Sequence, residues 1–374
     1  MENIEGVQQH LQAAAIAKEV LTVVLTNVSA GVKVASLCKL GDELIVGYAN
    51  KVCPEKSTEK GVAFPTCISV NNEIQNVSPA EDTPDYIIRP NDVVKVELAV
   101  HISGYIASQA HTIVINPTPE VPVADRRADV VCATKVAHEA AVRMMCPGNK
   151  SRDVIDAIGK IAEAFQCTPM ESTFSQLTTR YVLSGAKTFP NHHDPEEPYP
   201  NFEFEVGDVF IVNVALSNGS GVARDGGAKP MVYQRDVNVK YYLKLKASQA
   251  LFKYVSKQFS VFPFSSRQIT DTRMKLGLSE CINHQVLVPY PSLVDKRPDA
   301  HVAQFQSTVM VTHRGPVCLT PSLPMSFVHS DRNLPNDSSL SALLNQNLTV
   351  AQLPSLPSVD GLRTNLDGPE MMMS

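Results

Sequence analysis

The chain has 374 residues, of which 44% are hydrophobic, and its formal net charge is −5. This length allows one large core or two ordinary ones, and the charge excludes a polycationic chain, so any nucleic-acid contact must come from a local patch. Apolar runs fall short of the ~18 residues that a membrane-spanning helix needs, and the opening MENIEGVQQHLQAAAIAKEV does not resemble a signal peptide. Eight cysteines without a Cys-x-x-Cys pair indicate reduced thiols in an intracellular compartment.

Helical spacing of apolar residues predicts three helices in the first half of the chain. The first spans residues 4–28. The second spans 125–145 and ends before Pro147 and Gly148. Ser151 then predicts the N-cap of a third helix, whose core face extends to Phe165.

Runs of β-branched residues predict strands at 93–100, 105–115, 209–216 and 302–311. Helices and strands therefore occur in mixed order, which indicates an α/β or α+β domain. The composition changes near residue 335, where Ser, Leu and Pro become frequent. We expect one short helix around residues 340–348 and otherwise a flexible tail.

The common motifs of catalytic and nucleotide-binding sites are absent. The sequence has no phosphate-binding G-x-x-x-x-G-K-[ST], no G-x-S-x-G and no H-E-x-x-H. The glycine-rich stretch 218–229 is interpreted as a surface loop. His192, His193 and Asp194 could ligate a metal, but their proline-rich acidic surroundings favour a solvated turn.

Four separated segments resemble, in order and spacing, those that build the pocket of type II methionine aminopeptidases. They are AFPTCISVNN (63–72), the hairpin KVELAVHISGYIASQAHTIVI (95–115), FEVGDVFIVNVALSNGSG (204–221) and VAQFQSTVMV (302–311). The resemblance extends over residues 20–330. It is strongest to the proliferation-associated, ErbB-binding-protein branch, through RDVNVKYYLKLKAS (235–248) and PGNKS (147–151).

This resemblance implies a pita-bread fold, in which mixed antiparallel sheets related by a pseudo-twofold axis are covered by helices. It implies one such domain over residues 1–334, with a basic helical subdomain inserted at about 235–298. Residues 335–374 would form the flexible tail.

The resemblance also identifies the positions of the active site. The positions of the five metal ligands are Glu97, Ser108, Gln176, Asn213 and Gln306. The positions of the two substrate-positioning histidines are Asn76 and Ser184.

These residue types do not suit a pair of divalent cations. Two such ions carry four positive charges, and Glu97 is the one carboxylate among the five ligand positions. We therefore predict a pseudo-enzyme with no metal, no cofactor and no catalytic residue. Two alternatives remain open, namely a cleft that holds a peptide N-terminus against Glu97 and a peptidase with a rearranged or single-metal site.

Residues 235–275 contain nine basic side chains and only two acidic ones. The predicted RNA-binding residues are Arg235, Lys240, Lys244, Lys246, Lys253, Lys257, Arg267, Arg273 and Lys275. Apolar residues interleave with them, which is typical of an amphipathic helix with a basic outer side. An ordinary solvated helix face would have the same pattern.

In the branch that the chain resembles, this subdomain contacts the large ribosomal subunit near the polypeptide exit. The expected function is therefore binding to ribosomal RNA and exit-tunnel proteins during ribosome biogenesis or translation. The expected partner list includes no membrane, and the protein is expected to be a monomer. A protein-interaction module that uses the cleft is the alternative. We expect a cytoplasmic protein, and nuclear or nucleolar residence is left open because the lysine-rich tail typical of the branch is missing.

Overall fold

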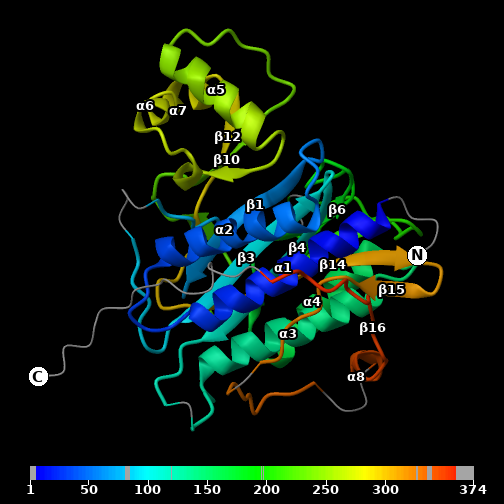
Figure 1. The fold of residues 1–374 in the computed structure, drawn as a ribbon. Coiled ribbons are helices and arrows are strands. Elements are labelled where there is room, and N and C mark those ends of the chain that lie inside the picture. Colours follow the sequence, from blue (N-terminus) through cyan, green and yellow to red (C-terminus); the bar gives the residue numbers. More distant parts are fainter. Residues whose placement is uncertain are drawn as a thin grey trace, which may run out of the picture.

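The computed structural model describes residues 6–80, 85–118, 120–194, 196, 198–325, 327–334 and 339–358, and a ten-stranded sheet lies at its centre (Figure 1). Seven strands have the order β1-β3-β4-β14-β8-β6-β7, and every neighbouring pair is antiparallel. Their bounds are β1 Lys60–Val70, β3 Val93–Ile102, β4 Tyr105–Val114, β14 Val302–Thr312, β8 Val209–Ser217, β6 Phe174–Thr178 and β7 Thr188–Pro190. The short strands at the edges are β5 Thr168–Pro169, β15 Gly315–Cys318 and β16 Thr349–Val350.

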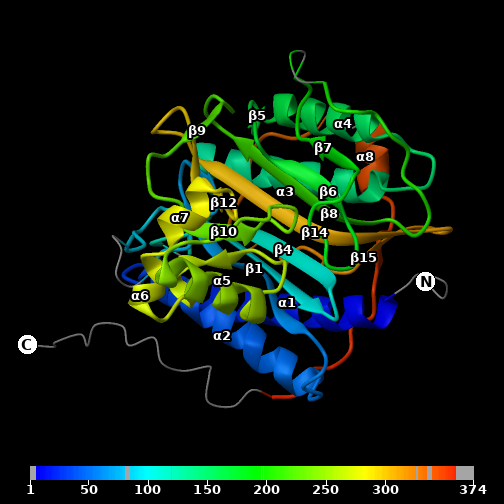
Figure 2. The ribbon, with the colours of Figure 1, turned by 90° about the horizontal axis from the view of Figure 1, so that it is seen from above.

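Two pairs of helices cover the two halves of this sheet. Helices α1 (Val7–Asn27) and α2 (Val34–Val52) pack on β1, β3 and β4. Helix α3 (Arg126–Met144) packs on β8 and β14, and α4 (Ser151–Ala164) packs on α3. In Figure 2 the first pair lies at the bottom and the second pair at the top, each against its own half of the sheet. Each half thus buries its own apolar core, and the halves meet where β4 pairs with β14.

The alternation of side chains along the central strands separates core from cleft. On β3, Val96 and Leu98 belong to the first core, and Glu97 lies between them. On β14, Phe305 belongs to the second core, and Gln306 follows it. Because successive side chains of a strand point to opposite faces, Glu97 and Gln306 are directed away from the helices.

A smaller unit, which we call the insert, stands on one edge of the sheet domain (Figure 1). It contains a three-stranded sheet in the order β11-β10-β12 and three helices around a core of its own. Its elements are β10 Val232–Arg235, α5 Lys246–Gln258, β11 Phe264–Ser265, the 3-10 helix Ser266–Gln268, α6 Thr272–Lys275, α7 Leu278–Asn283 and β12 Leu287–Tyr290. At its base, β2 (Glu73–Gln75), β13 (Leu293–Asp295) and β9 (Ala223–Asp225) form a second small sheet.

The structure differs from the sequence-based expectations in several places. Helix α2 was not predicted. Ser151 is the first residue of α4 and not its N-cap, and the stretch 218–229, interpreted as a surface loop, contains β9. The short helix expected around residues 340–348 is present as α8 (Ser339–Leu344), which packs on α3. The flexible tail expected after it is wrong for residues 349–351, because β16 pairs with β15 and Ala351 is buried. The rest of that expectation, residues 335–338 and 359–374, lies outside the described residues. In the described part of the chain, no helix is long and apolar enough to cross a membrane.

Candidate functional site

All seven positions that the sequence singled out line one cavity of about 250 Å³. They come from β3, β4, β6, β8, β14 and two loops: Glu97, Ser108, Gln176, Asn213, Gln306, Asn76 and Ser184. The remaining lining residues are Phe64, Gln75, Ser172, Phe174, Leu183, Ile211 and Tyr290. The fold therefore brings together the seven positions that the resemblance identified, although their side chains differ from those of the aminopeptidases.

Neutral side chains in the cavity bond to one another across the strands. Gln306 Nε2 donates to Glu97 Oε1 at 3.1 Å, and Ser108 Oγ donates to Gln306 Oε1 at 2.5 Å. Gln304 Nε2 donates to Asn213 Oδ1 at 3.0 Å. Ala110 of β4 pairs with Glu97 on one side and with Gln306 on the other, and Gln306 pairs with Asn213, so strand register places these side chains in one row. At four of the five ligand positions, Glu97, Ser108, Asn213 and Gln306, the side chain thus already has a hydrogen-bond partner.

Glu97 carries the one carboxyl group among the described residues that line the cavity. Burial raises its pKa, and hydrogen bonds from Gln306 and Gln304 partly offset that rise. A raised pKa means that the folded protein disfavours the anion. Glu97 therefore faces two amide donors in surroundings that disfavour its charge.

Sequence reasoning missed two contributors to this site. Gln304 lies two residues before Gln306 on the same face of β14, so strand alternation could have identified it. Tyr290 comes from the insert, donates from its hydroxyl to Gln234 Oε1 at 2.6 Å, and has a pKa raised to about 12 by burial. Its neighbour Pro291 accepts a hydrogen bond from Asn76 Nδ2 at 2.9 Å. The base of the insert thus forms one wall of the cavity.

The donor set does not fit the two divalent ions of an aminopeptidase centre. Hard cations are bound by carboxylates that replace their water and neutralise their charge. Here the five ligand positions offer two carboxamides from β6 and β8, a third from β14, one hydroxyl and the carboxyl of Glu97. Among the described residues, no group of three or more His, Cys, Asp or Glu could hold a metal ion.

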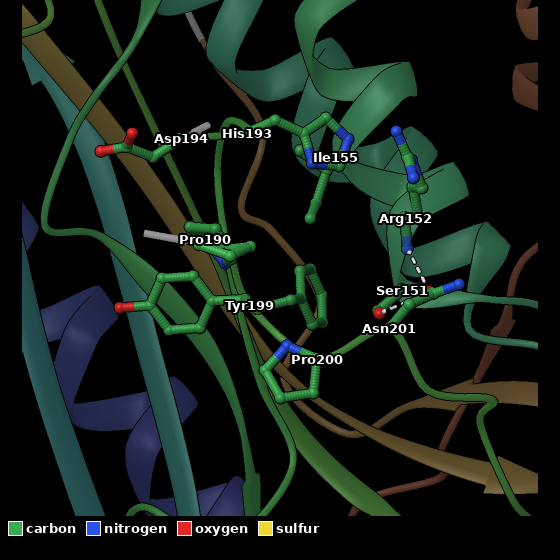
Figure 3. A pocket seen from close by; sticks show the side chains of 11 residues that line it. Ser151, Arg152, Ile155, Pro190, His193, Asp194, Tyr199, Pro200 and Asn201 are labelled. Atoms are coloured by element: carbon green, nitrogen blue, oxygen red, sulfur yellow. Dashed lines mark hydrogen bonds between the residues drawn. The ribbon is translucent and has the colours of Figure 1, made fainter. Parts of the chain in front are cut away.

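A second pocket, of about 310 Å³, lies beside the N-terminus of α4 and contains the His193 and Asp194 of the sequence motif (Figure 3). His193 Nε2 lies 2.9 Å from Asp156 Oδ1, and its ring is exposed. Asn201 Oδ1 accepts hydrogen bonds from Ser151 Oγ and from the backbone N–H of Arg152, both at 3.2 Å. These contacts describe a solvated loop that is fastened to a helix end, in line with the interpretation of the sequence.

The basic side chains of the insert divide into an exposed group and an interior group. The exposed ones are Lys240, Lys244, Lys246, Lys253, Lys257 and Arg273. Lys275 and Arg235 are half-buried, and Arg235 donates to Ser256 Oγ at 3.1 Å. The surface available to an anionic partner is therefore carried mainly by the loop 236–245 and by α5.

Arg267 corrects the predicted RNA-binding set. Its side chain is 7% exposed, and its guanidinium donates to Asp42 Oδ2 at 2.5 Å. It also donates to Ser78 Oγ at 2.8 Å. Because this ion pair is enclosed between the insert and α2, Arg267 fastens the insert to the sheet domain and is not available to a phosphate.

Comparison with known proteins agrees with this architecture. The model of metallopeptidase family M24 matches residues 8–231. Proliferation-associated protein A of Dictyostelium discoideum is 34% identical over 352 residues, which cover 94% of this chain and 91% of that protein. ErbB-3 binding protein 1 of Solanum tuberosum is 36% identical and covers 83% of this chain and 80% of its own length. A solved structure of a thermophilic Arx1 superposes with a TM-score of 0.84 at 28% identity, covering 91% of this chain and 98% of that one.

The chain therefore belongs to metallopeptidase family M24 and has its pita-bread fold. Within that family it belongs with the proliferation-associated and ErbB-3-binding proteins. The predicted family and fold class are confirmed. The family name describes peptidases, so the side chains of the cavity decide what this member can do.

Proposed function

We propose that this protein is a non-catalytic member of its family that docks on the large ribosomal subunit through its insert. Hydrolysis in this fold would need cations to generate hydroxide and to polarise the scissile carbonyl, and the amide-lined cavity offers them one carboxylate. The observation that carries the proposal is the exposed lysine surface of the insert. Its partners would be ribosomal RNA and proteins at the tunnel exit, in the cytoplasm, during subunit maturation or translation.

The helix α5 separates apolar and basic side chains in the way that such docking requires. Lys246, Lys253 and Lys257 are spaced by seven and four residues and so share one face. Leu251 and Val255, on the other face, are fully buried in the core of the insert. The lysines can thus approach a phosphate backbone while the helix stays packed.

Co-sedimentation with large subunits tests this proposal. With four lysine–phosphate contacts, raising the salt from 50 to 200 mM should weaken binding about 50- to 150-fold. Reversing the charge of Lys244, Lys246, Lys253 and Lys257 should abolish co-sedimentation. The matched control reverses four exposed lysines of the sheet domain: Lys18, Lys33, Lys56 and Lys160. Equal loss in both variants, or binding that salt does not change, would contradict docking through the insert.

A second candidate is a protein-interaction module that uses the cleft. The observation in its favour is that Glu97 opens into a cavity of about 250 Å³, where a peptide ammonium group could replace the amide donor of Gln306. ErbB-3 binding protein 1, one of the relatives above, is named for a protein partner. This candidate would be favoured if co-sedimentation with large subunits survived reversal of the four insert lysines and was lost in Glu97→Gln.

The remaining alternative is a peptidase with a rearranged metal site. Metal analysis of protein purified without chelator, together with an assay on Met-initiated peptides, tests it. If the purified protein held a stoichiometric amount of metal and hydrolysed these peptides, the peptidase would be established and the non-catalytic proposal would fail.

A further inference from the structure

The loop that joins β10 to α5 presents aromatic rings at the surface of the insert. Tyr242 is 84% exposed. The ring of Tyr241 stacks on that of His284, with centroids 3.7 Å apart and planes inclined by 12°. Both tyrosines line a groove of about 520 Å³, together with Arg235, Asp236, Val237, Val239, Lys240, Leu243, Phe252 and Val286. One loop thus presents an exposed tyrosine beside a stacked ring pair at the edge of a groove.

Hydrogen bonds hold the backbone of this loop in place. The carboxylate of Glu280 accepts from the N–H of Lys244 at 2.7 Å and from that of Leu245 at 3.0 Å. Gln249 Nε2 donates to the carbonyl of Leu243 at 2.7 Å, and the Leu243 side chain is buried in the core of the insert. The rings are therefore carried by a fixed backbone. Binding a ligand would then require little further ordering of the loop, so the entropic cost of binding would be small.

The charge around the groove is positive. Lys240 and Lys244 are exposed on either side of the two tyrosines in the sequence, and Arg235 lines the groove. Asp236 and Glu280 carry the opposing negative charges, and their carboxylates accept from the backbone N–H groups of Asn238, Lys244 and Leu245, so the three basic side chains leave a small positive excess. A partner that suits this surface combines negative charge with flat apolar rings.

We propose that Tyr242 and the Tyr241–His284 pair form a stacking site for an unpaired base of RNA, with Lys240 and Lys244 on the flanking phosphates. This inference rests on the proposed function and names the part of the nucleic acid that is recognised. Paired bases are stacked within their helix, whereas unpaired bases are free to stack on protein rings. The insert would thus bind a loop or bulge in preference to a continuous duplex.

The test uses the full chain and two RNA probes, a hairpin with 2-aminopurine in its loop and a duplex with the same base paired. We expect the wild type to prefer the hairpin and to quench its fluorescence. Tyr242→Phe, which keeps the ring, should behave like the wild type. Tyr242→Leu, which keeps an apolar side chain without a ring, should bind the hairpin about 5- to 150-fold more weakly. Because stacking releases no counterion, the dependence of affinity on salt concentration should be the same for Tyr242→Leu and the wild type.

Several results would overturn the stacking site. They are equal affinity for hairpin and duplex, absence of quenching, or equal affinity of Tyr242→Leu and the wild type. If the four-lysine reversal still abolishes co-sedimentation, docking through the insert stands and the stacking site alone fails. If that reversal has no effect and neither probe binds, both fail. Tyr242→Leu could also keep the wild-type affinity for RNA and yet bind the intact subunit more weakly. The ring of Tyr242 would then contact a ribosomal protein, and the RNA site would be overturned.

Discussion

In the cleft, polar side chains are turned inward and bond to one another, whereas on the insert they are turned outward to solvent. Gln306 is 4% exposed and contacts both Ser108 and Glu97, while Lys253 and Lys257 project from α5 without entering its core. The two regions belong to one fold and are joined by the wall that Tyr290 contributes. The contrast teaches that one fold can hold a pocket of mutually bonded polar groups and, on an inserted segment, a surface of exposed charged side chains.

The largest expected effect concerns the joint between the two regions. Arg267→Ala leaves the buried carboxylate of Asp42 without its partner, which should cost about 3 to 5 kcal/mol of stability. Urea unfolding measures this loss. Arg267→Met combined with Asp42→Leu removes both charges and should restore most of it. A loss below about 1 kcal/mol for Arg267→Ala would mean that the pair does not fasten the insert.

The next effect tests whether the cleft tolerates the charge of an active site. Gln306→Glu places a second carboxylate where an amide now lies 3.1 Å from Glu97, and should destabilise the fold by about 2 to 4 kcal/mol at neutral pH. Repulsion raises the pKa of the pair in the folded state, so stability should recover as the pH falls and one carboxyl takes up a proton. Thermal unfolding at several pH values measures both effects.

The control for Gln306→Glu transfers the carboxyl group from position 97 to position 306, so that the cavity still contains one carboxyl group. Glu97→Gln combined with Gln306→Glu should be nearly as stable as the wild type at neutral pH. Equal destabilisation of the double and the single variant would show that repulsion is not the cause.

A smaller effect is expected when Glu97 itself is neutralised. Burial raises the pKa of Glu97, so the stability that its protonated form provides is present at low pH and is lost as the pH rises through the folded-state pKa. Glu97→Gln should therefore raise the thermal midpoint at neutral pH and give no gain in acid. A midpoint that falls at neutral pH would indicate that the anion has a stabilising partner.

The central strands and the cleft could be predicted because their signals are local and periodic. Glu97 and Gln306 lie within β-branched runs, and the resemblance supplied their roles. Helix α2 was missed because it contains Gly41 and Gly47 and has no side-chain cap at Lys33. Gly41 is needed there because a Cβ would lie 2.4 Å from Thr66 Oγ1.

Long-range contacts account for the other differences. Arg267 and Asp42 are 225 residues apart, so a basic residue in a basic segment gave no sign that it would be buried. Ala351 and β16 are held by β15, a contact that composition alone cannot reveal. Polar, proline-rich sequence indicates disorder only when nothing is available to pack against it.

The measurement that tests the account most directly compares one variant of each region on the same sucrose gradient. The first reverses Lys244, Lys246, Lys253 and Lys257 on the insert, and the second is Glu97→Gln in the cleft. We predict that the cleft variant travels with large ribosomal subunits as the wild type does, and that the insert variant stays at the top of the gradient. Loss of the cleft variant from the subunits, with retention of the insert variant, would contradict it.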